Sequence, residues 1–354
     1  MSADWDNARR ILCVRLDSLG DVLMCTPAIR ALRERRRSRA ITLLTSPTAA
    51  PAAPFVPELE GVITYEAPWM KTSQAHDPQA DLDFAAALAE QRFDAAVIFN
   101  SYSQSPLPAA LLCYLARIPL RLAYCHENPY QLLTHWLPDP EPDKVIRHEV
   151  RRQLDLVAHV RCKPSSTRMS FTVREPDLDT VRAHLDRLGV GPEQRWILLH
   201  PGASAASRRY PPEQWAQAIR ELDERIKLPM VLTGGPHEQP LVDEIREQCG
   251  VAVHSLAGLL SLGELGAALK LATVVVCNNT GPAHIAAAVG TPLVDLYAMT
   301  NPQHTPWQVR NRLLYHDVPC RFCMKSVCPQ GHNECLSKIA PAQVVEAVCS
   351  LLEP

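Results

Sequence analysis

The stretch of residues 277–297, CNNTGPAHIAAAVGTPLVDLY, contains a complete strand-to-helix-to-strand transition. An apolar run ends at Cys277, Thr280 is a residue type that favours a helix N-cap, and Gly281 opens a segment of small residues. A second apolar run follows from Pro292 to Tyr297. Two strands joined through a helix predict a parallel pair with a right-handed crossover, which is the building unit of α/β domains.

The same alternation runs through the rest of the chain. Short β-rich runs are separated by segments with apolar residues at helical spacing, such as Glu213–Leu222, Glu238–Gln248 and Leu262–Leu271. We therefore predict an α/β fold with parallel sheets. The expected strands are Ile11–Leu16, Ala40–Thr45, Gly61–Tyr65, Ala95–Asn100, Trp196–His200, Met230–Thr233, Val251–Ser255, Thr273–Cys277 and Pro292–Tyr297.

The length of the chain predicts two domains. Its 354 residues are about twice the common domain size, so two hydrophobic cores are expected. A proline-rich stretch and a polar segment place the junction between Val145 and Asp177. We predict two Rossmann-like domains, residues 1–165 and residues 166–354. Two parallel sheets that face each other would line an interdomain cleft with the carboxyl ends of their strands, where open α/β folds bind ligands.

The composition excludes several classes of protein. The 36 Lys and Arg nearly balance 38 Asp and Glu, so the chain has no overall basic field and we predict no nucleic-acid partner. The apolar run after the polar start at 1–10 is too short for a signal-peptide core or a membrane span, which favours a cytoplasmic protein. In such a protein most of the twelve cysteines are expected as reduced thiols.

The turn before the predicted helix at 281–289 is a candidate anion site. Unpaired N–H groups at a helix N-terminus favour phosphate, and Gly281 lets a ligand approach the backbone closely. His284 lies one turn further, on the same helix face as Thr280. The residue types alone leave a second interpretation open, in which this is a tight turn with an ordinary cap and a packed histidine.

Two more strands in the same half end in glycine-bearing loops. In the first loop, HPGASAASRR, Arg208 and Arg209 are either phosphate ligands with forked donors or surface charges. In the second, TGGPHE, the carboxylate of Glu238 either bonds ribose hydroxyls or caps its helix. Three such exits predict a nucleotide-diphosphate site in the C-terminal domain. Neither GxxxxGK[ST] nor GxGxxG occurs, which disfavours a P-loop NTPase or an ordinary dinucleotide dehydrogenase.

The loop after the first predicted strand, RLDSLGD at 15–21, contains a candidate base. Asp21 stands at the start of a helical segment, where a carboxylate accepts bonds from unpaired N–H groups of the first turn. The same carboxylate could instead act as a general base that faces the cleft. Asp17, four residues earlier, is the second candidate for that base.

Several motifs, taken together, resemble the heptosyltransferases of glycosyltransferase family nine. They appear in that family's order between about residues 10 and 300, and they are VRLDSLGDVLMCTPAIRAL, HPGAS, RRYPPEQW, GGPHE, LAGLLSLGEL and NNTGPAHIAAAVGTP. The resemblance implies a GT-B architecture, an ADP-heptose donor in the C-terminal domain, and a lipopolysaccharide-core or related acceptor at the N-terminal domain. It also implies inversion at the anomeric carbon without a catalytic metal.

The resemblance also assigns roles to individual residues. Asp21 matches the family's proposed general base, with Asp17 and Ser18 beside it as acceptor contacts. The residues expected to bind the donor are Ser204, Arg208, Arg209, Glu238, Asn279, Thr280, Gly281 and His284. Two of these depart from the family pattern. Arg208 stands where many members have Lys, and Asn279 stands where many have Asp, so the transferred sugar is the less certain part of the assignment.

The late cysteines form a separate cluster. Cys320, Cys323, Cys328 and Cys335 fall within sixteen residues, beside His332. Thiols and a histidine are the ligand types of a small structural Zn or Fe site, although this spacing is not that of a standard zinc finger. Four free thiols in a loop are the alternative. The chemistry at the sugar is not expected to depend on this segment.

The basic run and the transferase activity each have more than one interpretation. The basic run Arg33–Arg39 ends a predicted helix and is either a solvated helix end or a contact with anionic lipid at the inner membrane surface. The alternatives to heptosyl transfer are a transferase for another sugar nucleotide, one that modifies a protein, and a binding scaffold that keeps the nucleotide site without turnover. Asn279 is the main residue that supports the scaffold.

Overall fold

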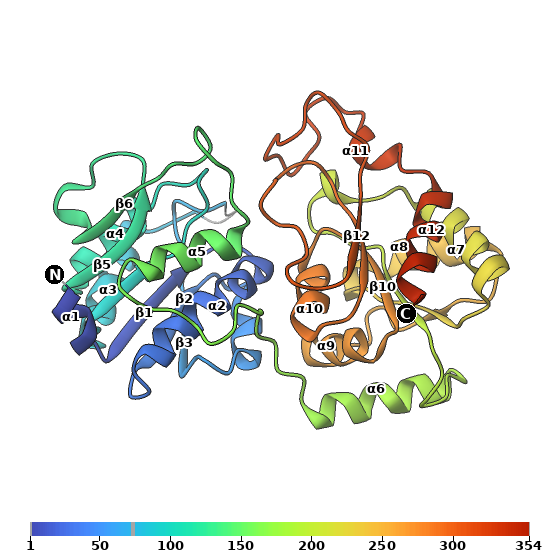
Figure 1. The fold of residues 1–354 in the computed structure, drawn as a ribbon, viewed down its shortest axis with the longest axis horizontal. Coiled ribbons are helices and arrows are strands. Elements are labelled where there is room, and N and C mark those ends of the chain that lie inside the picture. Colours follow the sequence, from blue (N-terminus) through green and yellow to red (C-terminus); the bar gives the residue numbers. More distant parts are fainter. Residues whose placement is uncertain (1, 72–74, 354) are drawn as a thin grey trace. The chain divides into compact units, whose positions relative to one another are not determined.

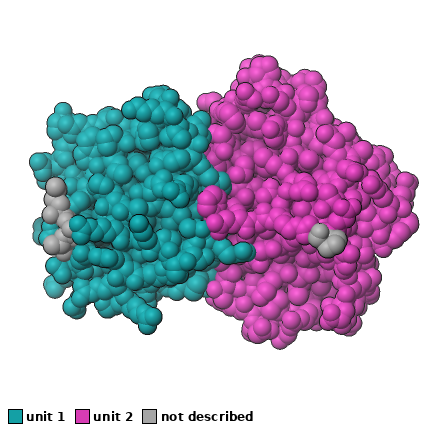
Figure 2. All heavy atoms as spheres, viewed as in Figure 1, with its two compact units in different colours: residues 1–170 teal, residues 171–354 magenta. Residues whose placement is uncertain are grey.

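The computed structural model describes residues 2–71 and 75–353. The chain divides into two compact units, Met1–Ser170 and Phe171–Pro354, which Figure 2 shows in different colours. Each unit is built on a six-stranded sheet with helices on both faces (Figure 1). This arrangement confirms the predicted α/β class with parallel sheets.

The first unit has the strand order β3-β2-β1-β4-β5-β6, and every neighbouring pair is parallel. Its strands are β1 Arg10–Arg15, β2 Ala40–Thr45, β3 Gly61–Thr64, β4 Ala95–Ile98, β5 Leu120–Cys125 and β6 His135–Pro138. Its helices are α1 Ser2–Asn7, α2 Leu19–Arg35, α3 Pro78–Glu90, α4 Leu107–Leu115 and α5 Glu149–Ala158, with short 3-10 turns η1 Ala50–Phe55 and η2 Tyr130–Leu132.

The second unit has the order β12-β11-β10-β7-β8-β9, again parallel throughout. Its strands are β7 Ile197–His200, β8 Met230–Leu232, β9 His254–Ser255, β10 Val274–Asn278, β11 Leu293–Leu296 and β12 Asn311–Leu314. Its helices are α6 Glu175–Arg187, α7 Pro212–Ile226, α8 Gln239–Cys249, α9 Leu262–Leu271, α10 Gly281–Val289, α11 Glu334–Ser337 and α12 Pro341–Leu352, with 3-10 turns η3 Ala206–Arg208 and η4 Pro236–Glu238.

Both sheets follow one topology. In each unit the chain builds three strands outward in one direction, then returns to the centre and builds three in the other. This is the Rossmann order, and the strand order reverses between β1 and β4 in the first unit and between β7 and β10 in the second. Ligands of open α/β sheets bind outside the carboxyl ends of the strands at such a reversal. The fold therefore directs attention to the loops after these four strands.

Side-chain alternation along the buried strands explains why helices cover both faces. On β1, Ile11 and Cys13 pack under α2 and α5, whereas Leu12 and Val14 pack under α3 and α4. A strand whose two faces are both buried reads as a continuous apolar run, which is the pattern in the sequence. In the second unit one face of the sheet packs against α7, α8 and α12.

Three strands and part of one helix were not predicted. β5, β6 and β12 were absent from the expected list, whereas the nine expected strands are all present: β2 has the expected bounds, and the ends of the others differ by at most three residues. The segment Trp69–Asp81 is rich in Ser, Gln, His, Asp and Pro, and its sequence predicts a loop; that prediction is wrong at its end, because α3 already begins at Pro78 with Asp77 as a capping residue. Residues 72–74 of that loop lie outside the described residues.

A close helix contact in the second unit yields a stability prediction. Gly266 of α9 faces Phe171, and an ideal Cβ at Gly266 would lie 2.2 Å from Cε1 of that ring. We expect Gly266→Ala to lower the free energy of unfolding by about 1–3 kcal/mol, because overpacking outweighs the gain of about 1 kcal/mol in helix propensity. Chemical unfolding measures the change. Gly191→Ala is the control, since no heavy atom lies within 4 Å of its added Cβ, and an equal loss there would contradict the prediction.

Among residues 2–71 and 75–353, none of the helices combines the length and the apolar character needed to cross a bilayer.

Candidate functional site

The loop after β1 holds Asp21 in the first turn of α2. Ser18 is the N-cap residue, and its backbone N–H and hydroxyl both donate to Oδ2 of Asp21, at 3.0 and 2.6 Å. This confirms the capping interpretation of Asp21. Capping uses one carboxylate oxygen and does not remove the charge, so the structure leaves the role as general base untested.

A buried arginine gathers three carboxylates behind this loop. Arg15, 1% exposed, contacts Oδ2 of Asp17 through Nε at 2.8 Å and Oδ1 of Asp21 through Nη2 at 2.9 Å. Its Nη1 contacts Oε1 of Glu149 on α5 at 2.6 Å. Gln153 also donates to that glutamate oxygen, at 2.8 Å. One guanidinium thus faces three acidic groups, and the cluster carries an excess of negative charge when all three are ionised.

Burial and neighbouring charges shift the pKa of Asp17 in this cluster. Burial raises the pKa of Asp17 above its usual value, the charge of Asp21 adds to the rise, and Arg15 opposes it. The side-chain amide of Gln104, from the loop after β4, donates to Oδ1 of Asp17 at 2.5 Å. The two loops at the strand-order reversal of the first unit are therefore joined through Asp17.

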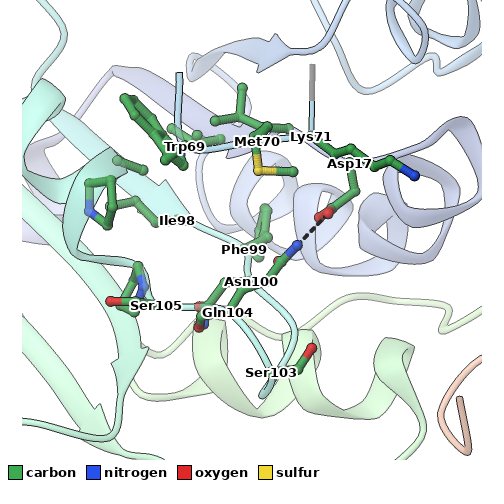
Figure 3. Close-up of a pocket in the computed structure, with 15 residues that line it drawn as sticks. Asp17, Trp69, Met70, Lys71, Ile98, Phe99, Asn100, Ser103, Gln104 and Ser105 are labelled. Carbon is green, nitrogen blue, oxygen red and sulfur yellow. Dashed lines mark hydrogen bonds between the residues drawn. The ribbon is translucent and has the colours of Figure 1, made fainter. Parts of the chain in front are cut away.

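A pocket of about 470 Å³ opens at this reversal (Figure 3). The residues that line it include Asp17, Gln104, Trp69, Met70 and Lys71. An aromatic ring, a carboxylate, an amide and an ammonium group around a hollow suit a polar, ring-shaped ligand such as a sugar. Asp21 is 8% exposed and is not among the described residues that line this pocket.

In the second unit a buried asparagine joins the loops at the reversal. Asn278, the last residue of β10, donates through Nδ2 to the carbonyl oxygen of Pro201 at 2.6 Å and accepts from the N–H of Tyr210 at 3.2 Å. It thereby holds both ends of the loop that follows β7. The segments HPGASAASRR and NNTGPAH, which are far apart in sequence, lie side by side as a result.

The helix N-terminus expected after β10 is present. Helix α10 begins at Gly281, with Thr280 as an extended N-cap residue, as the sequence predicted. The hydroxyl of Thr280 donates to the carbonyl oxygen of Asn278 at 3.3 Å, and no side-chain bond from Thr280 caps the helix. His284 is buried one turn further, with its ring 6.3 Å from that of His304. Asn279 is buried at the start of the turn.

The two arginines of the β7 loop differ in their surroundings. Nη1 of Arg208 donates to the carbonyl oxygen of Asn279 at 3.5 Å, which places the guanidinium beside the N-terminal turn of α10. Arg209 is exposed and donates through Nε to the carbonyl oxygen of Ala203 at 2.8 Å. Ser204 is exposed in the same loop. The geometry therefore brings Arg208, rather than Arg209, to the helix end.

Glu238 lies between two of the glycine-bearing loops. Its Oε2 accepts from the N–H of Gly235 at 2.8 Å, which confirms a capping role, and an ideal Cβ at Gly202 would lie 2.1 Å from its carboxyl group. Glycine at position 202 is thus required for this approach. The ring of His200 is 3.7 Å from the same Oε2, and burial lowers the pKa of His200. A ribose contact by Glu238 remains a prediction.

Sequence reasoning missed one buried acid at this site. Asp295 lies on β11 and is fully buried, and neither of its carboxylate oxygens has a hydrogen-bond partner among the described residues. Burial raises its pKa well above the usual value, against the influence of Arg208. The sequence did carry a signal for Asp295, because a charged residue inside the apolar run LVDLY is unusual. Asp295 is thus a buried acidic group whose charge interacts with that of Arg208.

The cysteine segment lies against the same loop. All four thiols and His332 line one cavity of about 20 Å³. Sγ of Cys320 is 3.8 Å from Nε2 of His332. Within the described residues, no group of three or more His, Cys, Asp or Glu side chains is arranged to hold a metal ion. The donor atoms of the predicted site therefore share one cavity without standing in a closed coordination geometry.

Most arginines of the basic run Arg33–Arg39 form hydrogen bonds or ion pairs within the first unit. Arg33 bonds the carbonyl oxygen of Arg39 and contacts Glu60, Arg35 pairs with Asp6, and Arg36 bonds a carbonyl oxygen in α1. Arg39 is buried and donates to three carbonyl oxygens. These contacts favour the structural interpretation of the run over a free basic surface.

Two parallel sheets in the Rossmann order, one in each unit, are the architecture of the GT-B class of folds. A solved structure of this class, that of E. coli ADP-heptose lps heptosyltransferase II, superposes with a TM-score of 0.73 over 97% of this chain and 98% of that one, at 23% identity. The family model for glycosyltransferase family 9 (heptosyltransferase) matches residues 82–333. This is more than half of the chain, and the protein belongs to that family.

Curated relatives agree with this assignment. Lipopolysaccharide heptosyltransferase 3 of Escherichia coli is 27% identical over 94% of this chain and 96% of its own length. Lipooligosaccharide heptosyltransferase 2 of Campylobacter jejuni is 28% identical over 44% of this chain. In that second comparison the match spans only about half of the relative, 51% of its length.

Proposed function

We propose that the protein is an inverting glycosyltransferase that transfers a heptose-type sugar from ADP-heptose to a lipopolysaccharide-core or related glycan. Its family supports the reaction class, and two relatives that carry heptosyltransferase names support the sugar. In this proposal residues 1–165 form the acceptor-binding domain and residues 166–354 the donor-binding domain. The observation that carries the proposal is the pair of polar loop sites, one at each strand-order reversal.

The donor diphosphate is proposed to bind at the N-terminus of α10. The positive end of the helix dipole at Gly281 and the guanidinium of Arg208 favour a negatively charged ligand. Ser204, Arg209 and Glu238 add polar groups around it, and Asn279, Thr280, Gly281 and His284 complete the proposed donor contacts. When the bond from the anomeric carbon to the diphosphate breaks, these groups stabilise the negative charge on the leaving group. No metal ion is required for that role in this mechanism.

The acceptor hydroxyl is proposed to lose its proton to Asp21. Its oxygen forms the new bond to the anomeric carbon from the face opposite the leaving diphosphate, which inverts the configuration. A positioned base of this kind contributes about 10²- to 10⁴-fold in rate. Asp17 and Ser18 are proposed to contact the acceptor, and the pocket lined by Asp17 and Trp69 suits one of its sugar rings.

Product analysis tests the proposal directly. The protein is incubated with ADP-heptose, UDP-sugars and GDP-sugars in the presence of a lipid-acceptor extract, and products are identified by mass spectrometry. A heptose added only from ADP-heptose is the expected result. Addition of another sugar, or of heptose to a protein, would replace the proposed substrate. Tight nucleotide binding with no transfer to any acceptor would favour the scaffold.

Arg208 provides a test of the donor site alone. We expect Arg208→Ala to weaken ADP binding by about 10- to 100-fold, because a hydrogen bond to a charged group contributes about 1.5–3 kcal/mol. Isothermal titration calorimetry measures the change. Arg225→Ala, which removes an exposed arginine paired with Glu346, is the matched control. Equal affinities for the two variants would remove Arg208 from the donor site.

We propose a cytoplasmic location for the reaction. All twelve cysteines are unpaired, which suits a reducing compartment. A peripheral contact with anionic lipid at the inner membrane surface stays a proposal, for which the exposed Arg37 is the remaining basic group of the run.

We also propose that Cys320, Cys323, Cys328 and Cys335 hold one structural Zn or Fe ion. The support is that these soft ligands share a cavity with His332. Metal analysis of the purified protein tests this, with about one ion per chain expected and none for Cys320→Ser. An equal metal content in the two proteins would contradict it.

A further inference from the structure

The cysteine segment, residues 320–335, packs directly on the proposed phosphate-binding loop. Ser207, 3% exposed, donates its backbone N–H to the carbonyl oxygen of Ser326 at 3.1 Å and its hydroxyl to that of Lys325 at 2.8 Å. Ser207 immediately precedes Arg208 and lines the same cavity as the four thiols. Both hydrogen-bonding groups of this buried serine are thus directed to the cysteine segment.

Two further attachments fix the segment to the body of the unit. Asn333 donates through Nδ2 to the carbonyl oxygen of Arg209 at 3.3 Å, so the loop is held on both sides of Arg208. The N–H of Met324 donates to the carbonyl oxygen of Thr300, beyond β11, at 2.8 Å. The segment therefore bridges the loop after β7 and the loop after β11.

The segment itself has little to hold its shape. Its only regular element within the described residues is the start of the four-residue α11, and its apolar side chains Phe322, Met324 and Val327 are exposed. Ordering a stretch without a core costs conformational entropy at each residue. The segment has four thiols around one small cavity instead of a hydrophobic core. Metal binding to such thiols is coupled to folding.

We infer that the four thiols and Ser207 form a device that sets the donor affinity: a metal ion held by the thiols orders residues 320–335, and this order holds Arg208 in position through Ser207. Ser207 is a positioning residue in this inference, and it contacts neither sugar nor phosphate. The inference rests on the proposed ADP site and on the proposed thiol ligation. It adds that the two sites are energetically coupled.

Coupling between two binding sites is reciprocal. If the metal tightens ADP binding by some factor, ADP must tighten metal binding by the same factor, and couplings of this kind are typically about 5- to 150-fold. This gives a readout that does not depend on catalysis. It also separates the inference from a metal that merely stabilises the fold, since such a metal would leave both affinities independent of each other.

The test compares ADP dissociation constants by calorimetry under reducing conditions. Wild-type protein loaded with Zn²⁺ is expected to bind ADP about tenfold more tightly than chelator-treated protein. Competition with a chromophoric chelator is expected to show Zn²⁺ bound about tenfold more tightly when ADP is present. Ser207→Ala loses the hydroxyl bond to Lys325 but keeps the backbone bond to Ser326, so with its zinc content unchanged it is expected to bind ADP more weakly than wild type and to show a smaller effect of zinc. This variant keeps the test valid if the metal-free protein unfolds.

The outcomes separate the inference from the proposals beneath it. Cys349→Ser changes a half-buried cysteine of α12 outside the cluster and is expected to behave as wild type. Equal ADP affinities with and without zinc, or an undiminished effect of zinc in Ser207→Ala, would overturn the coupling while the donor site stands. Absence of zinc binding would overturn it together with the thiol site. Failure of fully loaded wild-type protein to bind ADP would overturn the proposed function itself.

Discussion

Replacing Asp21 with Asn is expected to slow sugar transfer by about 10²- to 10⁴-fold and to leave ADP binding unchanged. The carboxamide keeps the size of the side chain and can still accept the bond from the Ser18 N–H, but it cannot take a proton from the acceptor. Single-turnover rates with saturating donor measure the effect. Because a base must be ionised to act, the wild-type rate should fall as pH drops through its pKa, and the residual rate of the variant should lack this limb.

Asp17→Asn is the necessary comparison for this prediction. Asp17 lines the pocket of the first unit and has a pKa raised by burial, whereas Asp21 has both oxygens engaged by Ser18 and Arg15. If Asp21 is the base, Asp17→Asn should mainly raise the KM of the acceptor. A larger loss of rate in Asp17→Asn than in Asp21→Asn would make Asp17 the general base and Asp21 the acceptor contact. Unchanged rates in Asp21→Asn would remove that residue from the mechanism.

Features that depend on residues close together in the sequence, such as helix ends and strands, could be predicted. Helix α10 begins and ends where Thr280, Gly281 and the glycine after Val289 indicate, because caps and glycines act on the backbone beside them. The parallel sheets followed from apolar runs that alternate with helical segments. The loops after β1, β7 and β10 were singled out because glycines mark them, whereas the loop after β4, which holds Gln104, has no glycine and was not.

The strands that were missed have mixed patterns. β6 and β12 are edge strands with half-buried residues, so they lack the apolar run of a central strand. β5 contains the buried Arg121, and a charged residue is not expected in a core strand. Its guanidinium donates hydrogen bonds to the carbonyl oxygens of Leu132 and Gln131, and no local sequence pattern reveals these bonds.

The candidate site was predicted residue by residue, but not its supporting contacts. Arg15 and Glu149 are separated by 134 residues, and Asp17 and Gln104 by 87. Asp295 reaches the donor loops only because β11 lies beside β10. Pairings of this kind depend on the tertiary fold, and a single sequence carries no signal for them. The motifs therefore marked candidate residues, whereas the contacts and charges around these residues required the structure.

Replacing Arg15 with Met is expected to lower the free energy of unfolding of the first unit by about 3–5 kcal/mol. The arginine is buried and contacts Asp17, Asp21 and Glu149, so its loss leaves three acidic groups without their shared cation. Hydrogen exchange measured by mass spectrometry reports the loss in β1 and α2, with peptides of the second unit as an internal reference. Arg37→Met, at an exposed position of the same unit, is the matched control.

The dependence on pH distinguishes lost charge pairing from lost packing. Without Arg15 the folded-state pKa of Asp17, which burial already raises, should rise further above its unfolded value of about 4. A raised folded-state pKa favours the fold below the unfolded value, and this contribution disappears as pH rises through the folded value. The deficit of Arg15→Met should therefore be largest near neutral pH and shrink toward pH 4, and Arg15→Lys should fall between the two proteins. A deficit of the same size at every pH would show that packing, and not charge, is what Arg15 contributes.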